Sequence, residues 1–283
     1  MPNLSNTMYK TLGNPNLKPE RYHSTSGNLS YWNSGTMLNF SLSGGASFYD
    51  NQIVYNQNTE FISNQGYVTV SEPSNVSGGN RFYTSFWSSF PLVKTKLTMN
   101  VSANGNISNS PVFINQIENN TNSKSYGGRI GFNLTVGQAL SFYASGSGSQ
   151  TFTTYSIQND RDQSYINYSA SLSGKWQVFG KTFLEGSYGF SNYNNKKLDF
   201  NQSINRLDVS IRQVVGKKNQ WELRLAAMDI LNQNQSIRQI AAVNYIEYRT
   251  SPTLARYFLL TAAYNIRGFD VKSTTNRRMI IKK

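Results

Sequence analysis

The residue types that most often perform chemistry in proteins are scarce in this chain. Among its 283 residues there is no cysteine and one histidine, His23. The absence of cysteine excludes disulfide frameworks, thiolate nucleophiles and cysteine-based zinc or iron–sulfur sites. A single histidine also leaves most histidine-based metal sites without enough ligands, and we interpret His23 as a surface residue.

Two further patterns resemble sites without their usual context. Asp160 and Asp162 have the residue types of a glycosidase carboxylate pair, but they lie in a loop rich in Asn and Gln. The Gly146-Ser147-Gly148 segment has the glycines of a phosphate-binding loop, but no helix is expected after it. We therefore predict that the chain is not an enzyme and holds no metal or cofactor.

The composition is unusual for a soluble domain. Charged residues make up 14% of the chain, against about 25% in a typical soluble domain. The net charge of +13 permits binding to nucleic acid or anionic lipid, but the basic residues are scattered, so no nucleic-acid partner is predicted. The mean hydropathy of −0.50 argues against transmembrane helices.

Alternation of apolar and polar residues recurs along most of the chain. In 97–104 every odd position is apolar, and 38–48, 166–176 and 258–266 repeat the pattern. Such alternation predicts β-strands with one apolar face. Runs of about 10–15 residues exceed the usual 5–6 of globular strands and suit a membrane barrel. Eleven main strands are expected, at 20–33, 36–50, 77–90, 94–107, 124–136, 139–153, 163–177, 181–192, 202–215, 219–231 and 255–267.

The connections between these strands alternate in length, which is typical of an up-and-down barrel with short periplasmic turns and longer extracellular loops. A hairpin at 60–70 could add to the strand count. Short turns are expected at 33–35, 91–93, 137–138, 178–180 and 216–218, and long loops at 51–76, 108–123, 154–162, 193–201 and 232–254.

Charged and tryptophan residues fit the same hypothesis. A charge on the lipid face of a barrel costs about 2–4 kcal/mol near mid-bilayer, whereas a lumenal charge stays hydrated. Tryptophans near the short turns suit an interface girdle. The residues predicted to face the lumen are Arg129, Lys175, Glu185, Arg206, Asp208, Arg212, Glu222 and Arg224, and the predicted girdle is Trp32, Trp87, Trp176 and Trp221.

Eleven strands cannot close a barrel with an antiparallel seam, because the first and last run in the same direction. Bacterial single-chain barrels have even strand numbers, and open edges in lipid are costly. The N-terminal segment also lacks the basic and apolar regions of a secretory signal. We therefore expect an all-β, antiparallel transmembrane barrel segment that is the C-terminal part of a larger barrel.

Particular motifs carry a family resemblance. Residues 13–20, GNPNLKPE, resemble the NPxLKPE signature of TonB-dependent outer-membrane receptors. Residues 228–234 (MDILNQN), 244–247 (NYIE) and 256–260 (RYFLL), followed by Tyr264-Asn265, resemble the end of the barrel in the Bacteroidetes branch of outer-membrane β-barrel proteins.

This resemblance implies a 22-stranded barrel, of which residues 1–269 would supply strands 12 to 22, with a basic, flexible periplasmic tail at 270–283. It implies location in the cell outer membrane. The expected partners are the outer-membrane lipid, a missing N-terminal half with a plug domain, the TonB complex acting through that plug, and a possible lipoprotein. The lumenal charges would contact the plug.

The implied function is import of a siderophore, cofactor, glycan or peptide captured by extracellular loops. The alternatives are a passive or oligomeric pore-forming barrel and a soluble basic β-protein that binds glycan or nucleic acid. The candidate ligand-binding residues are Tyr55, Asn58, Asn115, Asn119, Tyr155, Asn159, Tyr193, Asn234, Arg238 and Tyr245.

Overall fold

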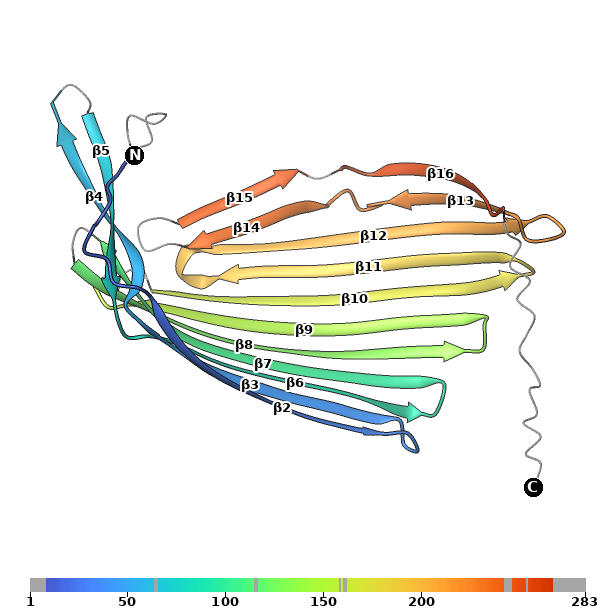
Figure 1. The fold of residues 1–283 in the computed structure, drawn as a ribbon. Coiled ribbons are helices and arrows are strands. Elements are labelled where there is room, and N and C mark those ends of the chain that lie inside the picture. The colour runs from blue at the N-terminus through green and yellow to red at the C-terminus, as the bar shows by residue number, and fades with distance from the viewer. Residues whose placement is uncertain are drawn as a thin grey trace.

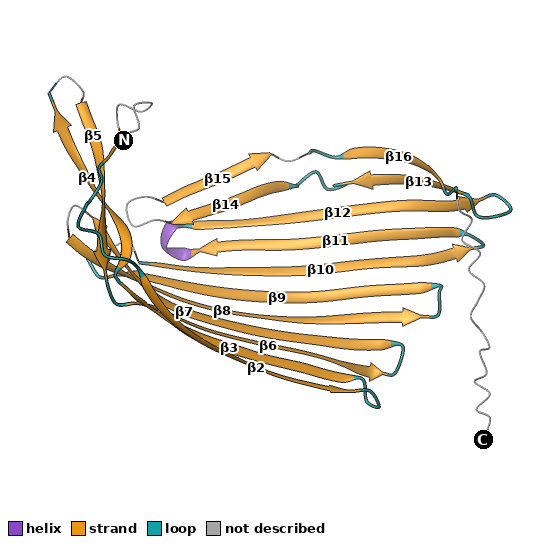
Figure 2. Cartoon of the chain, in the orientation of Figure 1, coloured by secondary structure: helices purple, strands orange, loops and turns teal. Residues whose placement is uncertain are grey.

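The computed structural model describes residues 9–63, 66–114, 117–157, 159, 162–241, 246–252 and 254–266. In this part of the chain the structure is almost entirely β (Figure 2), and Lys196–Leu198 form a short 3-10 helix, η2. The predicted tail at 270–283 lies outside the described residues.

Eleven long strands form one antiparallel sheet that curves into a trough (Figure 1). The eleven predicted strands are thereby confirmed. The sheet is not closed: in the described ranges β2 pairs with β3 alone and β16 with β13 alone. In spatial order the strands are β2 (Arg21–Asn33), β3 (Leu38–Asp50), β6 (Gly79–Val93), β7 (Leu97–Ile114), β8 (Ile117–Val136), β9 (Leu140–Tyr155), β10 (Gln163–Phe179), β11 (Thr182–Asn195), β12 (Phe200–Val215), β13 (Trp221–Met228) and β16 (Tyr257–Tyr264).

Cross-strand pairing gives this sheet two different faces. In an antiparallel ladder, residues directly opposite each other point to the same side. Ser171 pairs with Ser145, whereas the next residue, Leu172, pairs with Ala144 and Tyr188. The register keeps most serine, asparagine and charged side chains on one side, the polar face, and most large aliphatic side chains on the other, the apolar face.

The apolar face is exposed. Leu172, Leu225 and Leu260 are 43%, 53% and 75% exposed. The chain has an accessible surface of 19812 Å², whereas a globular monomer of 31.9 kDa exposes about 12,000 Å². A single-layer sheet explains the difference, because its apolar face is not packed against a second layer of the described structure.

The short connections are tight turns gathered at one end of the sheet, the short-turn end. Gly137 and Gly180 have φ angles of +59° and +53°, a region that costs residues with a Cβ roughly 1–2 kcal/mol. All five predicted short turns are present, with the turn after β6 at 94–96 rather than 91–93.

The long connections lie at the opposite end, the long-loop end, and contain more strand than predicted. Segment 51–76 forms the hairpin of β4 (Gln52–Ile62) and β5 (Gly66–Val76), joined by β1 (Tyr9–Thr11), so the possible hairpin at 60–70 is present. Segment 108–123 continues β7 and β8, and β14 (Gln235–Ala241) pairs with β15 (Ile246–Pro252). Predicting loops there was wrong, because these segments pair their backbones although they lack the long, regular alternation of apolar and polar residues that marks the other strands.

Candidate functional site

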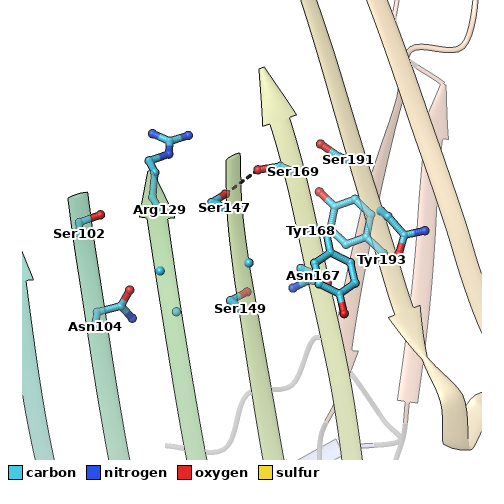
Figure 3. Close-up of a pocket in the computed structure, with 14 residues that line it drawn as sticks. Ser102, Asn104, Arg129, Ser147, Ser149, Asn167, Tyr168, Ser169, Ser191 and Tyr193 are labelled. Carbon is cyan, nitrogen blue, oxygen red and sulfur yellow. Dashed lines mark hydrogen bonds between the residues drawn. The ribbon is translucent and has the colours of Figure 1, made fainter. Parts of the chain in front are cut away.

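A shallow hollow lies on the polar face over the middle of β7 to β11 (Figure 3). Its volume is about 400 Å³, and because it spans five neighbouring strands we place it on the inner side of the trough. Ser147 and Ser169 share a 2.7 Å hydrogen bond within it, and Arg129 and Tyr193 contribute to its lining. Hydroxyl, amide and guanidinium groups suit this surface to hydrogen bonding with a polar or anionic ligand.

A network of ion pairs occupies the polar face near the short-turn end. Arg212 and Arg224 lie directly opposite each other on β12 and β13, a placement that is unfavourable for two like charges. Glu185 on β11 accepts hydrogen bonds from both guanidinium groups, at 2.9 Å from Arg212 Nε, and Glu222 lies 3.3 Å from Arg212 Nη1. Glu185 therefore neutralises a repulsion that the register creates.

An aromatic ring completes this network. The Phe183 ring centroid lies 4.6 Å from Lys175 Nζ and 4.3 Å from Arg212 Cζ, within the range of cation–π attraction. The Arg212 side chain is 12% exposed, and its guanidinium group contacts Glu185, Glu222 and the Phe183 ring. The register places all eight charged residues predicted to face the lumen on the polar face, and five of them form this one network.

A second ordered cluster lies where β13 ends, at the long-loop end. Asp208 forms a 3.0 Å ion pair with Arg206 and accepts a 2.8 Å hydrogen bond from the Asp229 backbone N–H. The Asp229 carboxylate is 2% exposed and accepts from the backbone N–H groups of Gln233 and Asn234. These bonds turn the chain out of the sheet, which is why β13 stops at 228 and not at the predicted 231.

The signature segment 13–20 is a clamp on the β4–β5 hairpin. Asn75 accepts a hydrogen bond from Lys18 N at 2.6 Å, and its Nδ2 donates to the carbonyls of Lys18 and Asn51. Glu20 accepts from the backbone N–H of Ile53. The motif residues thus fix how the hairpin leaves the rim of the sheet.

Two of the candidate ligand-binding residues are not available to a ligand. Asn119 and Tyr155 are 0% and 3% exposed. Asn119 Oδ1 accepts hydrogen bonds from Ser156 Oγ and the Ile157 backbone N–H, each at 3.0 Å. These residues join the ends of neighbouring strands, and the sequence could not separate this role from binding because both use the same polar side chains.

The remaining candidates are spread along the long-loop end. Asn58 donates to Glu60 on β4, beside exposed Tyr55, and the Asn159 carbonyl accepts from Lys197 Nζ at 3.4 Å. Tyr193 alone among the candidates lines the hollow. Asn234 lies in the cluster around Asp229 and Arg238 lies in β14, whereas Asn115 and Tyr245 lie outside the described residues.

The four tryptophans lie toward the short-turn end but not on one face. Trp176 and Trp221 pair with residues of the apolar face, such as Leu184 and Val215. Trp32 and Trp87 pair with Asn39 and Ser41, so they lie on the polar face. The expectation that the four tryptophans form one ring therefore fails for Trp32 and Trp87, because proximity to a turn in the sequence does not reveal which side of the sheet a side chain takes.

The serine ladder was missed by sequence reasoning. Ser145 and Ser171 are joined by a 2.7 Å hydrogen bond, as are Ser147 and Ser169. Their signal in the sequence is serine at alternate positions over 145–149 of β9 and 169–173 of β10, and three of these small side chains, Ser147, Ser149 and Ser169, line the hollow.

Comparisons with known proteins do not supply a family. No protein-family model matches the chain, and no curated protein matches its sequence. Within the described ranges, no helix has the length and hydropathy needed to cross a membrane. Among the same residues, no group of three or more His, Cys, Asp or Glu side chains is placed to hold a metal ion.

Proposed function

We propose that this chain is the C-terminal part of the barrel of a TonB-dependent outer-membrane receptor that imports a nutrient ligand. The observation that carries the proposal is the two-faced sheet of long strands, with an exposed apolar face and a charged, hydrogen-bonded polar face. Exposed apolar area on this scale indicates a surface that meets lipid or another protein. The resemblance of 13–20 and of the C-terminal motifs to this family adds to the proposal.

The direction of the two edge strands supports a complementary partner sheet. Both β2 and β16 run from the long-loop end to the short-turn end, because ten antiparallel steps separate them. A second copy of the chain would meet each edge in parallel, whereas a sheet whose own edges run the other way would pair antiparallel at both seams. A preceding set of eleven strands meets this requirement, which gives 22 in all.

The polar face would then line the lumen. The hollow and the ion-pair network are the surfaces that a plug domain and a passing ligand would contact, and the hairpins at the long-loop end would capture the ligand outside. The TonB complex would act through the plug, and a lipoprotein could cover the mouth. The ligand classes remain siderophore, cofactor, glycan and peptide.

One alternative has an observation in its favour. The free edges of β2 and β16 would allow several copies to close a passive pore, at the cost of parallel seams, which are slightly less stable than antiparallel ones. This alternative predicts channel conductance by the purified chain alone in a planar bilayer.

Expression of the chain with an added secretory signal, alone and together with the missing half of the receptor, tests the proposal. We expect detergent-dependent β-structure in the outer-membrane fraction, with protease resistance when the other half is present. A folded monomer recovered in buffer without detergent would contradict it. In the full receptor, we expect deletion of residues 52–76 and 233–254 to weaken ligand uptake.

A further inference from the structure

A second hollow lies on the apolar face, at the long-loop end of β9, β10 and β11. Its volume is about 570 Å³, within the range of small-molecule sites. Phe152 of β9 and Ile166 of β10 supply apolar lining, and Phe152 is 37% exposed. This hollow is separate from the polar-face hollow, because the register places Phe152 and Ile166 on the opposite side of the strands from Ser147 and Ser169.

Lysines surround this apolar hollow. Lys196 and Lys197, at the turn between β11 and β12, contribute to its rim. Lys124 of β8 is paired directly with Phe152 and with Ile107, so it stands on the apolar face among apolar neighbours. Among the described residues that line the hollow there is one carboxylate, Asp162, and it already accepts a hydrogen bond from the Tyr155 backbone N–H.

A lysine on a lipid-facing strand is costly unless its ammonium reaches the headgroup region. Lys124, Lys196 and Lys197 all lie at the long-loop end of the apolar face, where the strands would leave the hydrocarbon under the proposed function. Among the described residues, Lys196 and Lys197 line this rim with one carboxylate, and Lys124 stands beside Phe152, so the described part of the rim has a net positive charge. An apolar hollow beside such a rim is complementary to a molecule with acyl chains and a phosphate.

We propose that this site binds an acyl lipid of the membrane whose phosphate headgroup has a net negative charge, with an acyl chain against Phe152 and Ile166 and the phosphate on Lys196 and Lys197. The inference rests on the proposed function for the orientation of the chain in the bilayer. Its occupant is a lipid and not a transported solute, because the hollow opens on the apolar face.

Native mass spectrometry of the full chain in detergent, with tetraoleoyl cardiolipin or dioleoyl phosphatidylcholine as the probe, tests the site. We expect cardiolipin to bind at least tenfold more tightly, and the double substitution Lys196→Gln with Lys197→Gln to remove about tenfold of that affinity. Lys217→Gln with Lys218→Gln, a matched pair in the turn at the short-turn end, should leave it unchanged. Phe152→Ser should weaken binding of both lipids.

Equal affinity for the two lipids, or equal losses in the two double variants, would overturn the site. Raising the salt concentration provides a second readout on the unsubstituted chain: a contact between the lysines and a headgroup of net negative charge predicts weaker cardiolipin binding, whereas binding of the zwitterionic phosphatidylcholine should change little. A chain that folds in buffer and binds neither lipid would contradict the proposed function itself, whereas a detergent-dependent chain without a lipid preference would contradict this site alone.

Discussion

The two faces of the sheet are built from the same strands but are stabilised differently. On the polar face, side chains bond to one another, as in the Glu185 network and the serine ladder. On the apolar face, large side chains such as Leu225 and Leu260 remain 53% and 75% exposed. Many side chains of the polar face therefore find bonding partners within the chain, whereas large side chains of the apolar face remain exposed and would be stabilised by a nonpolar surrounding.

The largest expected effect comes from placing one charge on either face of β10. Leu172 and Ser173 are neighbours on opposite faces. In vesicles, we expect Leu172→Arg to lower the free energy of unfolding by about 2–4 kcal/mol, and Ser173→Arg to have a much smaller effect. Urea titration of both variants measures the difference. Equal effects would mean that the two faces meet the same solvent.

Removing the carboxylate of Glu185 should destabilise the ion-pair network on the polar face. Glu185→Gln leaves Arg212 and Arg224 opposed without their shared counter-ion, and we expect a loss of about 1–3 kcal/mol in the free energy of unfolding. Glu222 contacts only Arg212 among these residues and its side chain is 36% exposed, so Glu222→Gln should cost clearly less. A larger loss for the Glu222 variant in the same urea titration would contradict the role assigned to Glu185.

Two glycines, Gly45 on the polar face and Gly27 on the apolar face, differ in the space available for a larger side chain. A Cβ at Gly45 would lie 2.8 Å from Tyr83 Cε1 on the polar face and 2.7 Å from the Thr25 carbonyl oxygen, whereas a Cβ at Gly27 has nothing within 4 Å. We expect Gly45→Ala to destabilise the chain by about 1–2 kcal/mol and Gly27→Ala to be neutral. The midpoint of unfolding in urea distinguishes them.

The smallest expected effect concerns the clamp formed by the signature segment. Asn75→Ala removes one accepted and two donated hydrogen bonds to residues 18 and 51. Each is worth roughly 1 kcal/mol, and together they hold the hairpin in place without joining strands of the large sheet. We expect faster proteolysis within residues 52–76 and unchanged global unfolding. A shift of the global midpoint instead would place the clamp within the cooperative unit of the sheet.

The strands could be predicted from the sequence because period-2 alternation is a local property, and all eleven appear. The faces of Trp32 and Trp87 could not, since each follows another aromatic residue, Tyr31 or Phe86, and the local pattern does not say which of the two lies on the apolar face. The same holds for Asn119 and Asp229, whose burial depends on segments that cross at the long-loop end. The sequence predicted that the charged residues of the Glu185 network share one face, but which of them pair could be known only from the register of β11, β12 and β13.

Under the proposed function, one face of these strands meets lipid and the other meets water. The chain contains no cysteine, so single cysteines can be introduced one at a time across residues 169–176 of β10 in the membrane-embedded receptor and reacted with a membrane-impermeant maleimide. We expect labelling at 169, 171 and 173 and protection at 170, 172 and 174. Uniform labelling along the strand would contradict it.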